Sequence, residues 1–169
     1  MLTINAKKGC IVLLIVLTVV VVVILRIFLM TLDAQQEERK QQQQTEQRQS
    51  EILSIAISNA ASLNKNRAES IIDLSKITTF SWDTLYIFPP YTPSDTLDRT
   101  LGEKWLGPTN IEDSDGIVLL VFTDNGKVVQ YLEYPRSPYD FAFAKKKRYS
   151  RQEAVFTIDS EGRMIDYHK

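Results

Sequence analysis

The chain opens on a nearly unbroken apolar run, and every later segment is more polar. Residues 10–25 carry no charge and a single polar side chain, Thr18, and the run resumes after Arg26 as far as Leu32. A helix over residues 9–32 would be about 36 Å long at about 1.5 Å per residue, longer than the roughly 30 Å core of a bilayer. The pattern predicts a transmembrane anchor over residues 9–32.

The charges that flank the apolar run predict its orientation. Lys7 and Lys8 precede the run, and the positive-inside rule places such residues in the cytoplasm. Residues 1–8 would then form a cytoplasmic tail, and the chain from residue 33 onward would lie outside the cytoplasm. A cleaved signal peptide is the alternative. Bulky Leu32 stands where a cleavage site needs a small residue, which favours a retained anchor.

A glutamine-rich segment follows the apolar run. Residues 33–50 hold eight glutamines, seven charged side chains and no large apolar residue. This composition cannot bury enough surface to form a core, although glutamine, glutamate, arginine and lysine all favour helix. We therefore expect a solvated, partly helical stalk over residues 33–50, with no apolar repeat that would support a coiled coil.

Helical periodicity returns after the stalk. Isoleucine, leucine and alanine recur on one face between residues 51 and 63, and Ser50 is a suitable N-cap. We expect this helix to pack on the sheet of the domain that follows. A helix lying on the membrane is the alternative, but its polar face carries little positive charge. Residues 68–77 predict a second short helix or an irregular lead-in.

The remaining sequence alternates short apolar runs with turn residues. Asn125-Gly126 tolerates the positive φ angles of a type I′ turn, so it predicts a hairpin. Ser94 and Gly102 are typical of the start and end of a helix between them. The predicted strands cover residues 82–88, 116–123, 127–134, 154–158 and 164–167. Helices followed by such strands predict an α+β domain over residues 51–169, with one antiparallel sheet of about four to five strands.

Charge and residue counts exclude several functions. Twenty Lys and Arg balance 21 Asp and Glu, which is not the basic excess of a nucleic-acid-binding protein. One cysteine and one histidine exclude an intrachain disulfide, a multi-cysteine zinc site and a histidine triad. The acidic run 112–115 lacks the EF-hand spacing, because Ile111 stands where the first calcium ligand belongs. We therefore expect no metal, no cofactor, no nucleic-acid partner and no identifiable catalytic residue.

Four residues near the predicted strands are candidates for a binding groove. They are Asp83, Tyr91, Tyr134 and Arg136. Tyrosine and arginine are enriched in protein interfaces, which motivates the choice. Structural roles are the alternative: Asp83 would pair with Arg136, and the tyrosine hydroxyls would bond to the backbone of turns.

A second candidate surface is basic. Lys145, Lys146, Lys147 and Arg148, hereafter the basic segment, follow Phe143 and precede Tyr149. Interleaved aromatic and basic residues can engage anionic lipid headgroups, and a membrane anchor would keep this segment near a bilayer. A solvated loop is the alternative interpretation.

Two segments resemble parts of a known protein class. Residues 82–91 (WDTLYIFPPY) and 128–136 (VVQYLEYPR) resemble small uncharacterised bacterial membrane-anchored or lipoprotein-like envelope proteins. The resemblance covers residues 80–160 and excludes the anchor and the stalk. It implies a location in the cell envelope, and it brings no established activity and no catalytic residues.

The sequence as a whole predicts a single-pass membrane protein that displays one domain outside the cytoplasm. We expect a non-enzymatic binding or assembly module that meets another envelope protein, since no catalytic set is identifiable. A small envelope hydrolase or polymer-binding enzyme that uses a carboxylate pair is the alternative. A purely structural, lipid-facing role for the basic segment is a third possibility.

Overall fold

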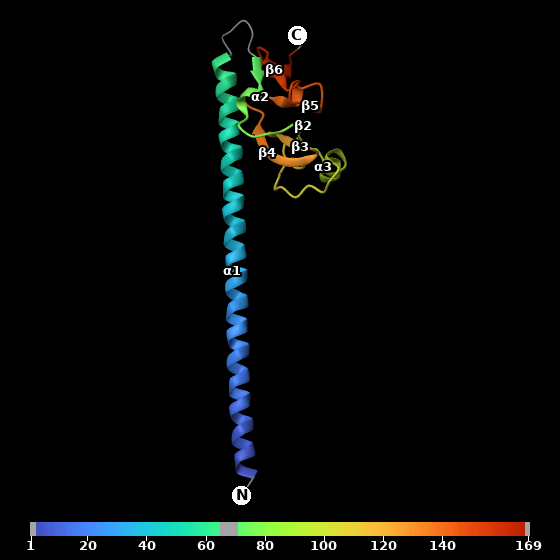
Figure 1. Cartoon of the computed structure of the whole chain (residues 1–169). Helices are drawn as coiled ribbons and strands as arrows, with labels where there is room; N and C mark the ends of the chain where they lie inside the picture. Colours follow the sequence, from blue (N-terminus) through green and yellow to red (C-terminus); the bar gives the residue numbers. More distant parts are fainter. Residues whose placement is uncertain (1–2, 65–70, 168–169) are drawn as a thin grey trace. The chain divides into compact units, whose positions relative to one another are not determined.

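The structure is a computed structural model that describes residues 3–64 and 71–167 (Figure 1). The chain divides into two compact units, Met1–Thr45 and Glu46–Lys169. We call the second the C-terminal unit. Helix α1 (Thr3–Asn64) begins in the first unit and contributes its last residues to the second.

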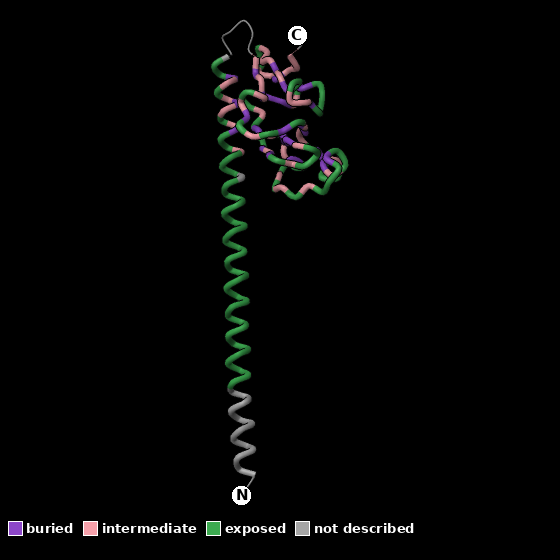
Figure 2. Tube along the Cα trace, viewed as in Figure 1, coloured by how far each residue is buried: buried purple, intermediate pink, exposed green. Residues whose placement is uncertain are grey.

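The described residues of the first unit are helical, and their side chains are exposed wherever these are described. Figure 2 shows this exposure along residues 16–45. Within the described part of the chain, α1 is the one helix long and apolar enough to cross a membrane. An 18-residue window of it has a mean hydropathy of 2.5, and none of that window is buried. This finding agrees with the predicted anchor in length and composition.

The structure corrects the predicted start of the second helix. The helix is continuous across Ser50, so Ser50 is not an N-cap. Residues 33–49 are helical throughout, although the sequence predicted only partial helix. The glutamine, glutamate, arginine and lysine residues of this segment have high helix propensity, and nothing in them breaks the helix.

The C-terminal unit contains two antiparallel sheets, so the prediction of a single sheet is wrong. The four-stranded sheet has the order β4 (Lys127–Pro135), β3 (Ile117–Asp124), β2 (Thr84–Phe88), β5 (Arg148–Ser150). The three-stranded sheet has the order β1 (Ile71–Asp73), β6 (Val155–Ile158), β7 (Met164–Asp166). Strands β1 and β5 have three residues each, too few to show a period-two pattern in the sequence.

The local signals for turns and helix ends are confirmed. Asn125 and Gly126 have φ angles of 51° and 76°, and they join β3 to β4 as predicted for a type I′ turn. Helix α3 (Ser94–Leu101) ends at Gly102, whose φ of 76° is left-handed. Ile71–Asp73 is a strand, followed by α2 (Leu74–Ile77), while residues 68–70 of the predicted lead-in lie outside the described residues. A short 3₁₀ helix, η1 (Phe141–Phe143), precedes β5.

The four-stranded sheet separates two hydrophobic cores. Alternate residues of β3 face opposite sides, because successive side chains of a strand point to opposite faces. Val118, Leu120 and Phe122 belong to the larger core, which also contains residues of α1 and of the three-stranded sheet. Leu119 and Val121 belong to the smaller core, which α3 covers with Leu97 and Leu101.

The last part of α1 packs against the larger core. Leu53, Ile57 and Ala61 recur every four residues and are 6%, 0% and 0% exposed. Figure 2 shows buried positions on this part of α1 and along the strands beside it. The helix face predicted between residues 51 and 63 is therefore the face that docks on the sheet.

Candidate functional site

Two of the four predicted groove residues lie at opposite ends of β3. Asp83 precedes β2, and its Oδ2 accepts a hydrogen bond of 2.8 Å from the Asn125 backbone N–H, which lowers the pKa of Asp83. Arg136 follows β4, and its backbone N–H donates to the Gly116 carbonyl at the start of β3. The Arg136 Nε lies 2.8 Å from Asp140 Oδ2. The suggested pair between Asp83 and Arg136 is therefore wrong.

The two predicted tyrosines have different surroundings. Tyr134 is 1% exposed, and its hydroxyl lies 3.0 Å from the Ser58 Oγ of α1; burial raises the pKa of Tyr134. Tyr91 is 60% exposed, and its backbone N–H donates to the Ile111 carbonyl. Tyr134 thus joins α1 to β4 within the core, while Tyr91 lies on the surface. None of the four predicted residues lines either of the two cavities described below.

The basic segment is held in place through its backbone. The Lys145 N–H donates to Asp166 Oδ1 and the Lys146 N–H donates to the Tyr149 hydroxyl, at 3.2 Å and 3.1 Å. The Tyr149 hydroxyl in turn donates to Asp166 Oδ1. The pKa of Tyr149 is raised by burial and by this carboxylate. All four basic residues are exposed at the surface.

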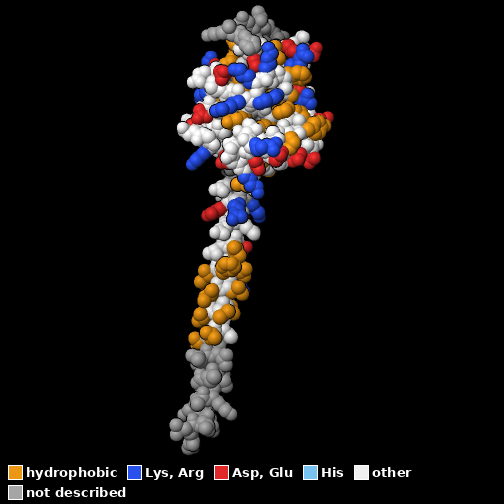
Figure 3. Space-filling model, turned by 90° about the vertical axis from the view of Figure 1, so that its right-hand side faces the viewer, with side chains coloured by type: hydrophobic (Ala, Val, Ile, Leu, Met, Phe, Trp, Pro, Cys, Tyr) orange, Lys and Arg blue, Asp and Glu red, His pale blue; other side chains and the backbone are white. Residues whose placement is uncertain are grey.

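The basic side chains differ in their partners. Lys146 Nζ lies 2.7 Å from Glu153 Oε1, and this contact, with hydrogen bonds from Ser150, lowers the pKa of Glu153 to about 2. The Arg148 guanidinium lies 5.8 Å from the centroid of the Tyr86 ring. Figure 3 shows several Lys and Arg side chains gathered on one face of the C-terminal unit, with hydrophobic side chains between them.

A polar cleft lies beside the basic segment. It has a volume of about 500 Å³ and is lined by the carboxylates of Asp73, Glu153 and Asp166. Lys76 pairs with Asp73 at 3.0 Å, and Lys146 and Tyr149 bond to the other two carboxylates. Over the described part of the chain, no group of three or more His, Cys, Asp or Glu residues could hold a metal ion. Each of the three carboxylates in this cleft is therefore already bonded to a lysine or to a tyrosine hydroxyl.

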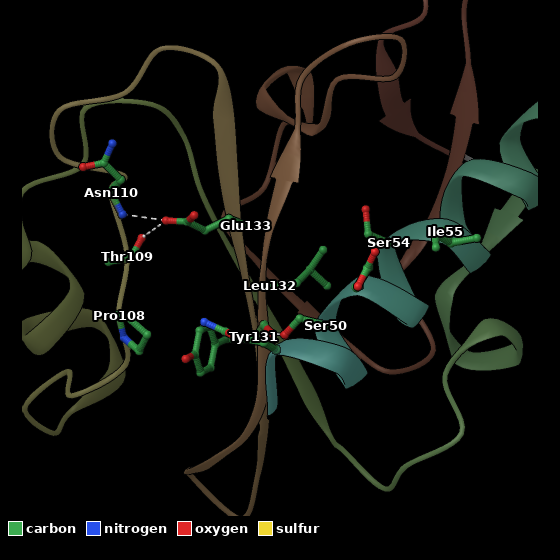
Figure 4. A pocket seen from close by; sticks show the side chains of 11 residues that line it. Ser50, Ser54, Ile55, Pro108, Thr109, Asn110, Tyr131, Leu132 and Glu133 are labelled. Atoms are coloured by element: carbon green, nitrogen blue, oxygen red, sulfur yellow. Dashed lines mark hydrogen bonds between the residues drawn. The ribbon is translucent and has the colours of Figure 1, made fainter. Parts of the chain in front are cut away.

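The larger of these two cavities is a groove at the β4 edge of the four-stranded sheet. Its volume is about 630 Å³, which is within the range of ligand sites. We call it the β4 groove, and it is shown in Figure 4. Its lining residues are Gln47, Ser50, Glu51, Ser54, Ile55, Pro108, Thr109, Asn110, Tyr131, Leu132 and Glu133.

Side chains and backbone of β4 bind both walls of the groove. On one side, the Ser50 Oγ of α1 donates a 2.7 Å hydrogen bond to the Tyr131 carbonyl. On the other side, Glu133 Oε1 accepts hydrogen bonds from Thr109 Oγ1, at 2.8 Å, and from the Asn110 N–H. Figure 4 shows β4 between Ser50 and Ser54 on one side and residues 108–110 on the other, with Glu133 directed toward Thr109 and Asn110.

The loop wall also rests on the smaller core. Trp105 packs edge-on against Tyr131, with ring centroids 4.9 Å apart, and Ile111 is 1% exposed within that core. The helix wall is fixed by Leu53 and Ile57. Because each wall is anchored in a separate core, the groove is a preformed feature of the C-terminal unit.

The floor of the groove is a strand edge with outward-directed backbone groups. Opposed residues of an antiparallel pair alternate between exchanging both backbone hydrogen bonds and exchanging none. Arg136 and Gly116 are a bonded pair, so the register makes Pro135, Glu133 and Tyr131 non-bonded positions. Proline at position 135 and the Ser50 contact with the Tyr131 carbonyl agree with this phase. The N–H and C=O of Glu133 therefore point away from β3, toward the groove.

The β4 groove was not among the sites predicted from the sequence. Its residues come from α1, from the 108–110 loop and from β4, and no local pattern brings these segments together. One signal was present, because a proline within a strand is typical of an edge strand. Pro135 could thus have identified β4 as an edge.

No family model, curated protein or solved structure matches the chain. The resemblance of residues 82–91 and 128–136 to small envelope proteins stays a prediction.

Proposed function

We propose that the chain is a membrane-anchored, non-enzymatic binding or assembly module of the cell envelope. Residues 9–32 span the membrane, residues 1–8 lie in the cytoplasm, and the C-terminal unit faces the outside. The exposed apolar window of α1 supports the anchor, and Lys7 and Lys8 support the orientation.

The observation that carries the proposal is the β4 groove. It is preformed, the outer edge of β4 forms its floor, and its volume suits a ligand segment of several residues. A protein partner in the same envelope would bind there and be held at the membrane by the anchor. Asp83, Tyr91, Tyr134 and Arg136 lie outside this groove, so the proposal does not depend on them.

Photo-crosslinking combined with a groove-blocking variant tests the proposal. Ser54 lines the groove, and Asn59, five residues later on α1, is exposed outside it. We expect Ser54→Trp to abolish the capture of a partner from solubilised membranes and Asn59→Trp to preserve it. If Ser54→Trp still captures the partner, the groove is not the binding site. If the chain crosslinks to no protein from any surface position, the proposed binding or assembly role is wrong.

Membrane orientation is tested separately. A reporter fused after Lys169 should be active outside the cytoplasm, and the intact chain should resist carbonate extraction of vesicles. A cytoplasmic reporter or a chain that carbonate removes would contradict the anchor.

The polar cleft supports a second candidate function. Three carboxylates, from Asp73, Glu153 and Asp166, line one cavity, and most glycoside hydrolases cleave the glycosidic bond with a pair of carboxylates. Activity of the full chain on wall polymers, lost in Asp166→Asn, would favour an envelope hydrolase. If the chain is a binding module, neither the unchanged chain nor the Asp166→Asn variant should cleave the polymers.

A further inference from the structure

We infer that the β4 groove binds an extended, positively charged peptide segment of a partner protein as an additional strand beside β4. This inference rests on the proposed function and specifies the chemistry of the partner. Strand addition gives affinity through backbone hydrogen bonds and specificity through alternate side chains. Four features of the groove lead to this conclusion.

The first feature is the outward-directed backbone of Glu133. Strand β4 is at the end of the order β4-β3-β2-β5, so among the described residues no strand pairs with its second edge. The register of β4 with β3 directs the Glu133 N–H and C=O toward the groove. An extended residue placed opposite Glu133 would exchange two hydrogen bonds with it, as a bonded pair of an antiparallel ladder does.

The second feature is the shape of the site. The groove has a wall on each side of the edge, from Ser50–Ile55 of α1 and from residues 108–110 (Figure 4). A strand lying between two walls would be shielded from water on both faces, which strengthens its hydrogen bonds. A flat or globular surface could not enter between the walls to reach the Glu133 backbone.

The third feature is the limited length of the edge. Ser50 already donates to the Tyr131 carbonyl, and Pro135 lacks an N–H. The edge therefore offers a short stretch centred on Glu133. Such shortening protects proteins from indiscriminate edge-to-edge association, and it leaves room for one short segment.

The fourth feature is charge. Glu51 and Glu133 are the charged residues of the groove lining, and no lysine or arginine is among them. Glu51 is exposed on the helix wall. A lysine or arginine in the bound segment would complement these carboxylates, which selects a basic peptide over an acidic one.

A second copy of this chain fits the groove poorly. A two-fold pairing of β4 with itself about Glu133 would set two carboxylates directly opposite each other, and like charges at that position destabilise a sheet. The same register would set Pro135 opposite Tyr131, and proline cannot donate to the ladder. These contacts disfavour a β4–β4 homodimer, so the occupant that we infer is a segment of a different protein.

The test uses the full chain in nanodiscs and a displayed library of random decapeptides as the probe. Enriched peptides should carry lysine or arginine, and their affinity should fall as salt is raised. Glu133→Pro removes the outward N–H without removing a bond to β3, and we expect it to lower peptide affinity by about tenfold or more. Glu133→Ala is the matched control, because it removes the carboxylate and keeps the N–H; we expect the smaller loss.

The peptide itself provides a test that does not depend on the folding of a variant. Each backbone nitrogen of one enriched peptide is methylated in turn. Strand addition predicts that methylation at every second residue abolishes binding and that the residues between tolerate it, because alternate N–H groups face β4. Absence of this alternation, equal effects of Glu133→Pro and Glu133→Ala, a concentration-dependent homodimer through β4, or a library that enriches nothing over empty nanodiscs would each overturn the inference.

These outcomes are separable from the proposed function. A partner that crosslinks in the groove but shows no period-two sensitivity to methylation overturns strand addition alone. A chain that captures no membrane partner in the Ser54→Trp experiment overturns the module, whatever the peptides do.

Discussion

Replacing Ile57 by alanine tests whether the last part of α1 is a structural component of the C-terminal unit. Ile57 is 0% exposed and packs in the larger core, so truncation removes three fully buried carbon atoms. At about 0.8 kcal/mol for each buried carbon, the lost transfer free energy is about 2.4 kcal/mol, and the cavity raises the total toward 3 kcal/mol. The better helix propensity of alanine returns only about 0.4 kcal/mol.

The matched control is Ile55→Ala on the same helix. Ile55 is 52% exposed, so its truncation leaves no closed cavity and should cost less than about 1 kcal/mol. For a unit of this size, 1 kcal/mol corresponds to about 4 °C in Tm. We therefore expect Ile57→Ala to lower Tm by about 10 °C and Ile55→Ala by less than about 4 °C.

Tryptophan fluorescence of the full chain in detergent is a suitable assay. Both tryptophans, Trp82 and Trp105, lie in the C-terminal unit, so their emission reports its unfolding and not that of the first unit. Equal shifts in Tm for the two variants would refute the docking of α1. The β4 groove would then lose its helix wall, and the strand-addition inference would fail with it.

Three further predictions concern other parts of the C-terminal unit. The folded pKa of Glu153 is about 2, below its usual value near 4.5, so its contribution to stability is present above pH 4.5 and is lost as the pH falls toward 2. Glu153→Gln should therefore reduce the loss of stability between pH 4.5 and pH 2 in pH-dependent denaturation. Gly162→Ala should lower the free energy of unfolding by about 1–3 kcal/mol in denaturant titration, since Gly162 has a φ of 82° and an added Cβ would meet the Pro138 carbonyl oxygen. Gly102→Ala should lower it by less, because the backbone there also has a positive φ but no atom lies near the added Cβ. Changing Lys145, Lys147 and Arg148 to glutamine should weaken binding of the nanodisc-held chain to anionic vesicles by up to about 1 kcal/mol per charge, and unchanged binding in a flotation assay would make the basic segment a solvated loop.

The elements that the sequence predicted correctly are those with strong local signals. The Asn125-Gly126 turn and the Gly102 helix end each require a positive φ, which asparagine and glycine supply, so the chain has few other conformations there. The helix face of residues 53–61 was readable because three buried residues recur at one spacing.

The features that the sequence could not predict depend on contacts between distant segments. The strand Ile71–Asp73 exists because it pairs with β6, more than 80 residues away, and not because of any pattern of its own. The β4 groove likewise needs Ser50, Thr109 and Glu133 to meet. Among the predicted binding residues, Asp83 and Arg136 were chosen for their chemistry alone. Each lies next to the end of a strand and bonds to another residue of the unit: Asp83 to the Asn125 N–H, and Arg136 to Asp140.

The position of β3 between the two cores has a consequence for hydrogen exchange. Its side chains enter both cores alternately, so β3 is fully exposed to solvent only when both cores have opened. Its amide protons should therefore exchange with deuterium more slowly than those of the three-residue strands. The free energy of exchange of the β3 amides should equal the global free energy of unfolding of the unit, and a lower value would show that β3 opens before the unit unfolds.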